Sequence, residues 1–188
     1  MDAPTDDERT LFDRLKNAAP WIALAVVAGV WIAQSGSGGY RGPLHGEPAP
    51  ELRVPTSEGT LDLAAERGRV VVLSFWATWC PACRQEGPVL SEVQRRVAPA
   101  GDGVVGISVD RMPLERVTAR ARGLGMTYPS GLGDDALAAR FGVSLLPTVV
   151  VIDPEGRVAD VFEGSVSADR LLEAVERARA GTPASARR

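Results

Sequence analysis

The pattern of hydrophobic and polar positions alternates between strand-like and helix-like segments over most of the chain. Apolar runs rich in β-branched residues, which are typical of strands buried on both faces, occupy 69–76, 103–110 and 148–153. Two short apolar segments, 52–54 and 61–63, flank a polar turn and predict a hairpin. A further strand is predicted over 157–162, and helices are predicted over 81–97, 113–125, 134–141 and 168–180. This order predicts an α/β fold, with a mixed central sheet flanked by helices and an N-terminal β-hairpin.

A longer apolar run at 18–33 lies in a stretch without charged residues that extends from 17 to 40. The run is short for a transmembrane helix, which needs about 20 apolar residues. We favour an uncleaved membrane anchor, and a cleaved signal peptide and a buried helix are the alternatives. Three basic residues lie between 9 and 16, whereas Arg41 is the only nearby one after the run. This asymmetry predicts that the N-terminus stays cytoplasmic and that the rest of the chain is exported, to a compartment where disulfides persist.

Five segments are predicted from these features. They are a cytoplasmic N-terminal tail (1–17), a membrane anchor or signal segment (18–34), a flexible tether (35–50), an α/β domain (51–180) and a C-terminal tail (181–188). The tether is rich in Gly, Ser and Pro, as flexible linkers are. It contains the only histidine, His45, which we expect to be solvated. The expected location is the cytoplasmic membrane, with a single span and the domain on the extracytoplasmic (periplasmic) side.

Charge and composition exclude two kinds of function. The formal net charge is -3, and basic residues are scattered along the chain, so no basic stripe is available to bind nucleic acid. Structural zinc needs four nitrogen or sulfur ligands, whereas the chain has two cysteines and one distant histidine. A copper site that combines thiolates with a histidine inside the domain is excluded for the same reason. We therefore expect no metal.

Both cysteines, Cys80 and Cys83, lie in the stretch SFWATWCPACRQEGP at 74–88. An exported domain can carry a structural disulfide, but a bridge that closes so short a loop removes little entropy from the unfolded chain. A redox-active pair is therefore the favoured interpretation, over a structural disulfide and over half of a metal site.

The predicted elements place the two cysteines differently. Cys80 falls where a strand ends and a helix begins, and Pro81 suits the first helical position. A helix N-terminus favours an anion, so we expect the pKa of the Cys80 thiol to lie below its reference value of about 8.5. Its sulfur would then be an exposed nucleophile at neutral pH. Cys83 lies one turn deeper, where it can attack a mixed disulfide formed on Cys80.

The motifs around the cysteines resemble those of a known fold. WCPAC at 79–83 follows a hydrophobic strand, Pro88 lies eight residues after the first cysteine, and LLPT at 145–148 precedes another strand. Together they resemble the thioredoxin fold, over about 47–178. With the membrane tether, the hairpin and Glu86, the chain is more narrowly similar to the TlpA-like thiol:disulfide oxidoreductases. These are exported, membrane-anchored proteins that include reductants for cytochrome c maturation.

The resemblance implies roles for five residues. Cys80 would be the attacking thiol and Cys83 the resolving thiol, with a disulfide between them in the oxidised form. Pro147 would be a cis proline facing the pair, and an X-Pro bond is where a cis peptide costs least, about 0.5 to 1 kcal/mol. Leu146 and Thr148 would offer backbone groups to an extended substrate peptide.

The resemblance also implies a catalytic role for Glu86, because the family uses an acid at this position to tune thiol ionisation. Its spacing puts it on the helical face of Cys83, where a carboxylate can exchange a proton with the resolving thiol. The alternative is an exposed residue on the second helical turn. The chain departs from cytoplasmic thioredoxins at Ser74, where they carry a buried aspartate, so that route for protons is absent.

The residues beside Cys80 are expected to contact the substrate. Trp79 and Pro81 are assigned to the substrate-binding surface on the strength of the resemblance. For Trp79 the alternative is packing around the cysteines, which is also what we expect of Phe75 and Trp76.

The resemblance implies an enzyme that exchanges disulfides with other proteins and needs no cofactor beyond its two sulfurs. We expect a reductant of disulfides in exported proteins, for example in cytochrome c maturation. Its partners would be exported proteins with cysteine pairs, a membrane thiol-disulfide electron donor and the membrane itself. A thiol oxidant, a peroxiredoxin-like peroxidase and a tethered binding module without redox turnover are the alternatives.

Overall fold

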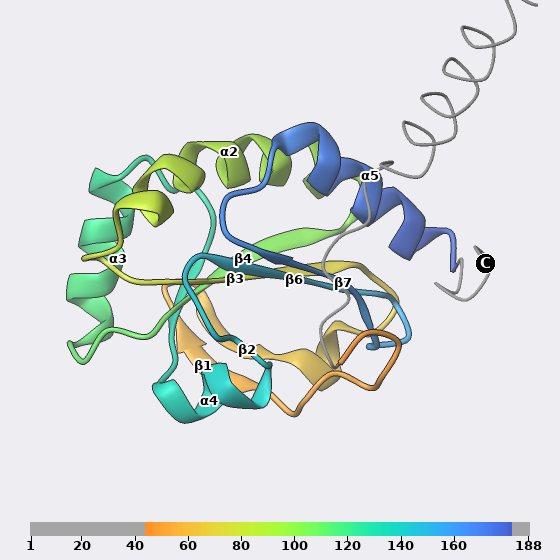
Figure 1. Ribbon diagram of the computed structural model, residues 1–188, viewed down its shortest axis with the longest axis horizontal. Coiled ribbons are helices and arrows are strands. Elements are labelled where there is room, and N and C mark those ends of the chain that lie inside the picture. The colour runs from red at the N-terminus through yellow and green to blue at the C-terminus, as the bar shows by residue number, and fades with distance from the viewer. Residues whose placement is uncertain (1–43, 182–188) are drawn as a thin grey trace, which may run out of the picture. The chain divides into compact units, whose positions relative to one another are not determined.

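The computed structural model describes residues 44–181 (Figure 1). A single seven-stranded sheet has the strand order β2-β1-β5-β4-β3-β6-β7. The strands are β1 (Arg53–Thr56), β2 (Gly59–Asp62), β3 (Val71–Trp76), β4 (Gly103–Ser108), β5 (Ser130–Leu132), β6 (Thr148–Ile152) and β7 (Val158–Glu163). The helices are α2 (Pro81–Val97), α3 (Leu114–Gly123), α4 (Asp135–Arg140) and α5 (Ala168–Arg179), with 3-10 turns η1 (Leu63–Glu66) and η2 (Ala98–Ala100). The predicted α/β fold with a mixed sheet and an N-terminal hairpin is confirmed.

Strand β3 lies between β4 and β6, parallel to the first and antiparallel to the second. All six of its residues are buried, as its continuous apolar sequence predicts. Successive side chains of a strand point to opposite faces. Val72 and Trp76 therefore belong to the core on one face, and Leu73 and Phe75 to the core on the other. The sheet thus separates two cores, and β3 ends four residues before Cys80.

Helices cover both faces of the sheet. Residues of α2, α3 and α5, such as Val93, Val117 and Leu171, share the first core with both cysteines. The second core contains Leu137 of α4 and Leu61 of the hairpin. Figure 1 shows α2 and α5 on one side of the sheet and α4 on the opposite side. The cysteine pair therefore lies on the face covered by the longest helix, α2.

Strand β5 is absent from the sequence prediction. It has only three residues, Ser-Gly-Leu, and neither its length nor its composition is typical of a strand. Its conformation is set by its neighbours, because it pairs in parallel with β4 and meets β1 antiparallel through Thr56 and Gly131. Through β5 the β1–β2 hairpin becomes part of the central sheet.

Residues 44–50 were predicted to be part of a flexible tether, but residues 46–49 are hydrogen-bonded to the start of β7 and to the turn before it. The amide of Gly46 donates to the carbonyl of Val158, and the amide of Val158 donates to the carbonyl of Glu47. Both ring nitrogens of His45 are buried without a hydrogen-bond partner, so the expectation of a solvated histidine is wrong. The prediction failed because Gly and Pro mark irregular backbone without revealing whether it packs on a sheet edge.

The predictions for the N-terminal tail, the membrane segment and most of the tether concern residues 1–43, outside the described residues. The same holds for 182–188 of the predicted C-terminal tail. Between residues 44 and 181, no helix is both long enough and apolar enough to cross a membrane.

Candidate active site

The two cysteines lie after the end of β3, at the start of α2. Cys80 is the N-cap residue of α2 and Pro81 occupies the first turn, as the sequence predicts. Cys80 and Cys83 form a disulfide, with their Cα atoms 5.3 Å apart. The amide of Cys83 donates a hydrogen bond to the Sγ of Cys80 at 3.2 Å. The sulfur of Cys80 thus receives one of the otherwise unpaired amides of a helix N-terminus, which is where a thiolate is stabilised after reduction.

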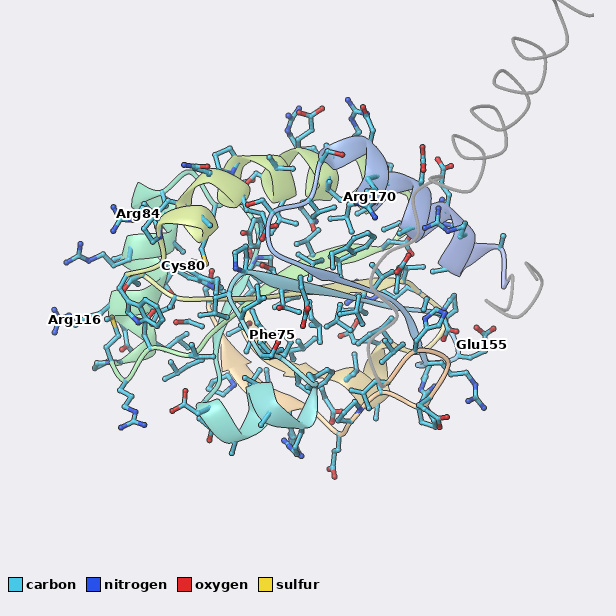
Figure 2. The ribbon with its side chains drawn as sticks, viewed as in Figure 1. Phe75, Cys80, Arg84, Arg116, Glu155 and Arg170 are labelled. Carbon is cyan, nitrogen blue, oxygen red and sulfur yellow. A yellow bond between two sulfur atoms is a disulfide. The ribbon has the colours of Figure 1, made fainter. Side chains whose placement is uncertain are left out.

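The disulfide lies almost entirely out of solvent. Cys80 is 4% exposed and Cys83 1%, so both are buried in this oxidised form. In this disulfide state Cys80 belongs to the same core cluster as Cys83, and the expectation of an exposed sulfur concerns the reduced thiolate, which stays a prediction. Cys80 is still the more exposed residue of the two. Figure 2 shows Cys80 at the start of α2.

Two large apolar side chains are exposed in the described part of the chain, one directly before Cys80 and one in the LLPT segment. They are Trp79, which is 66% exposed, and Leu145, which is 45% exposed. Trp79 therefore does not pack in the interior, which leaves it available to a partner. Trp76 packs in the core that contains the cysteines, whereas Phe75 lies in the opposite core against Phe141. The expectation that Phe75 packs around the cysteines is wrong, because it is one residue out of phase with Trp76 on the strand.

The LLPT segment at 145–148 has the backbone conformation that the resemblance implies. The bond between Leu146 and Pro147 is cis. Leu146 is partly exposed and packs against both core clusters, one of which contains the cysteines. Thr148 is fully buried, and its hydroxyl donates to the carbonyl of Leu145 at 2.8 Å. The roles of these residues in substrate binding remain predictions, and the burial of Thr148 leaves only its backbone for such a contact.

Glu86 is buried on α2, one turn after Cys83. It is 2% exposed, which excludes the alternative of a solvent-exposed residue. Its carboxylate accepts a hydrogen bond from the amide of Val166 at 3.3 Å. Burial raises the pKa of Glu86 to about 7, and the Val166 hydrogen bond opposes this rise. A carboxyl group with this pKa can both accept and donate a proton near neutral pH.

Tyr128 is a further buried titratable residue on this face, and the sequence motifs do not point to it. Burial, together with the charge of Glu86, raises the pKa of Tyr128 above its ordinary value. The ring of Tyr128 and the indole nitrogen of Trp76 lie on either side of Gly106, where a Cβ atom would come within 3.1 Å of each. The indole nitrogen is buried without a hydrogen-bond partner. Tyr128 therefore lies close enough to Glu86 for the two groups to influence each other's ionisation.

Thr78 and Asp110 are two further residues that the sequence analysis did not single out. The carboxyl group of Asp110 accepts hydrogen bonds from the backbone amide of Thr78 at 2.8 Å and from its hydroxyl at 3.0 Å. The sequence does contain a clue to Asp110, because this residue follows an apolar strand and functional residues are often found just after the carboxyl ends of strands. Among residues 44–181, no cluster of three metal-ligating side chains is present.

Comparison with known proteins places the chain in a family. The profile of the Redoxin family matches residues 44–178. The thioredoxin-like protein YneN of Bacillus subtilis is 28% identical over 127 residues, covering 65% of this chain and 73% of that protein. The thiol-disulfide oxidoreductase ResA of Geobacillus thermodenitrificans is 29% identical over 133 residues, covering 70% and 76%.

Solved structures are similar over the same region. A putative thiol:disulfide interchange protein DsbE from Chlorobium tepidum superposes with a TM-score of 0.65 at 27% identity, covering 71% of this chain and 96% of that one. A DsbF homologue from Corynebacterium diphtheriae superposes with a TM-score of 0.62 at 31% identity, covering 69% and 85%. Since the family profile spans most of the chain and the cysteine pair caps α2 within this fold, the chain belongs to the Redoxin family and is a thiol-disulfide oxidoreductase.

Proposed function

We propose that this oxidoreductase works as a reductant of disulfides in exported proteins, for example during cytochrome c maturation. In this proposal residues 18–34 anchor the chain in the cytoplasmic membrane and the domain faces the extracytoplasmic side. A membrane thiol-disulfide carrier returns the cysteines to the dithiol form after each turnover. The apolar run, the basic residues before it and the resemblance to TlpA-like proteins support this assignment.

The observation that carries the direction of electron flow is the buried carboxyl group of Glu86. Residues three apart on a helix are neighbours, so Glu86 lies beside Cys83 on α2. An ionised carboxylate there disfavours negative charge on the sulfurs of the reduced pair. It therefore lowers the stability of the thiolate form of the reduced pair relative to the disulfide, which makes the pair a better electron donor.

The reduction of a client then takes two steps. The thiolate of Cys80 attacks one sulfur of the client disulfide, which forms a mixed disulfide and releases the first client sulfur as a thiolate. Cys83 next transfers its proton to the carboxylate of Glu86 and attacks the Sγ of Cys80, which releases the second client thiolate. Two electrons pass to the client, and the Cys80–Cys83 disulfide of the present structure is the oxidised product.

The equilibrium reduction potential of the full-length protein tests this direction. The protein is equilibrated with thiol-disulfide buffers, and the free thiols are counted after alkylation. We expect a value near that of thioredoxin, about -270 mV. A value near -120 mV, which is typical of a strong periplasmic oxidant, would reverse the proposed direction while leaving the oxidoreductase assignment intact.

A second measurement tests the role given to Glu86. In Glu86→Gln the buried charge is gone at every pH, so the potential at pH 8 should become less negative than that of the wild type. The matched control is Glu92→Gln, which removes a partly exposed carboxyl group from the same helix. An equal potential for wild type and Glu86→Gln at pH 8 argues against Glu86 as the cause of a reducing pair.

A further inference from the structure

The turn before the disulfide is tied to the end of the neighbouring strand. Asp110 lies two residues beyond the end of β4, and Thr78 lies two residues before Cys80. One carboxyl oxygen of Asp110 accepts the Thr78 amide at 2.8 Å, and the other accepts the Thr78 hydroxyl at 3.0 Å. Both hydrogen-bond donors of Thr78, its amide and its hydroxyl, are therefore held by one side chain. Asp110 itself is only 5% exposed.

Asp110 is in turn fixed by its own strand. The hydroxyl of Ser108 donates to the carboxyl group of Asp110 at 2.8 Å, and the amide of Asp110 donates back to that hydroxyl at 3.1 Å. Ser108 is fully buried at the end of β4. The amide of Val109 donates to the carbonyl of Trp76 at 3.0 Å, which joins the ends of β3 and β4. A rigid strand end therefore presents the carboxyl group to the turn.

The other buried aspartates have different partners. Asp102 and Asp160 each accept a hydrogen bond from an arginine of α5, Arg179 and Arg177 respectively. Those contacts attach a helix to the sheet. The oxygens of Asp110 instead accept from the turn that leads to Cys80 and from Ser108, so its position bears on the cysteine pair.

We propose that Asp110 is a positioning residue for thiol-disulfide exchange, which holds Thr78 so that Cys80 caps α2 with its sulfur against the amide of Cys83. After reduction this alignment stabilises the Cys80 thiolate, because the amide and the helix N-terminus act only at short range. A looser turn would lose part of that stabilisation. The inference concerns the exchange chemistry itself and does not depend on the direction of electron flow.

The test is the pH dependence of the alkylation of reduced Cys80 by iodoacetamide in the full-length protein, with the modified cysteine identified by mass spectrometry. In Asp110→Asn a neutral amide oxygen replaces the two carboxylate oxygens as the acceptor, so the charge-assisted hydrogen bonds that hold Thr78 are weakened. We expect the midpoint of the pH profile to rise by about one unit, which is about a tenfold loss of rate below the midpoint.

The sign of the shift separates this proposal from two others. If Asp110 acts only as a nearby negative charge, its neutralisation favours the thiolate, and the midpoint falls. If Asp110 only supports the fold, Asp110→Asn is less stable but its midpoint is unchanged. Either result overturns the positioning role.

Two further variants complete the experiment. Thr78→Val keeps the carboxyl group and the Thr78 amide and removes only the hydroxyl donor, so we expect a smaller rise of the midpoint than in Asp110→Asn. Asp102→Asn is the matched control, a buried aspartate whose contacts lie at Val70 and Arg179, and it should lower stability without moving the midpoint. If Asp110→Asn does not fold, Thr78→Val decides, and an unchanged midpoint in that variant overturns the proposal.

Discussion

The buried carboxyl group of Glu86 makes the stability of the protein depend on pH in a way that one substitution should remove. Its pKa is about 7 in the folded state, against 4.5 as the reference for an exposed glutamate. The folded state therefore binds more protons than the unfolded state between these two values. Stability must fall as the pH rises through this window, and the loss is nearly complete by about pH 8.

The size of the effect follows from the difference between the two pKa values. A shift from 4.5 to about 7, at 1.36 kcal/mol per unit, corresponds to about 3 kcal/mol between pH 4 and pH 8. Glu86→Gln keeps the shape of the side chain and an oxygen that can accept the Val166 amide, but it cannot ionise. We expect its stability relative to the wild type to rise by about 3 kcal/mol from pH 4 to pH 8.

Urea unfolding of the oxidised full-length protein, followed by circular dichroism at several pH values, measures this difference. Other carboxyl groups titrate in both proteins and cancel in the comparison. Glu92→Gln on the same helix is the matched control, and its difference from the wild type should stay within about 1 kcal/mol, because Glu92 forms only a surface ion pair with Arg96. A difference between Glu86→Gln and the wild type that is constant from pH 4 to pH 8 would refute the reasoning.

Three further predictions concern the site and its support. Cys83→Ala should accumulate covalent mixed disulfides on Cys80 in cells, because the resolving thiol is missing; bands that persist under reducing electrophoresis would contradict this. Trp79→Ala should change the free energy of unfolding by less than about 0.5 kcal/mol, because the side chain is 66% exposed, while the reduction of a protein disulfide slows; an unchanged rate would remove Trp79 from the substrate-binding surface. Gly106→Ala should destabilise the protein by about 1 to 3 kcal/mol in urea unfolding, since the new Cβ would lie 3.0 Å from the Trp76 indole and 3.1 Å from the Tyr128 ring. Gly103→Ala on the same strand is its control, because a Cβ there meets only the end of the Arg69 side chain at 3.9 Å.

The local chemistry of the cysteine pair could be predicted from the sequence because it depends on residues close together in the chain. Strand β3 ends four residues before Cys80, Pro81 follows Cys80 directly, and Cys83 lies three residues after Cys80. All of these features therefore lie within a short stretch of the sequence. The long apolar runs of β3, β4 and β6 were predicted for a similar reason, since burial on both faces leaves a continuous hydrophobic signal.

Features that depend on contacts between distant segments could not be predicted. The hydrogen bonds of Asp110 to Thr78 join residues 32 positions apart, and Glu86 meets Val166 80 positions further on. The spacing to Cys83 indicates the helical face of Glu86 but not what covers it. Strand β5 likewise takes its conformation from β1 and β4 and carries no hydrophobic pattern of its own.

The attachment of residues 46–49 to β7 has a consequence for solubility. β7 is the last strand of the sheet, and the outer edge of such a strand offers unpaired amides and carbonyls to any other extended chain. Gly46 and Glu47 hydrogen-bond to Val158, the first residue of this strand, and Ala49 hydrogen-bonds to Gly156 in the turn before it. At this end of β7 the segment therefore occupies the backbone groups that an extended chain would need in order to add to the sheet as an eighth strand.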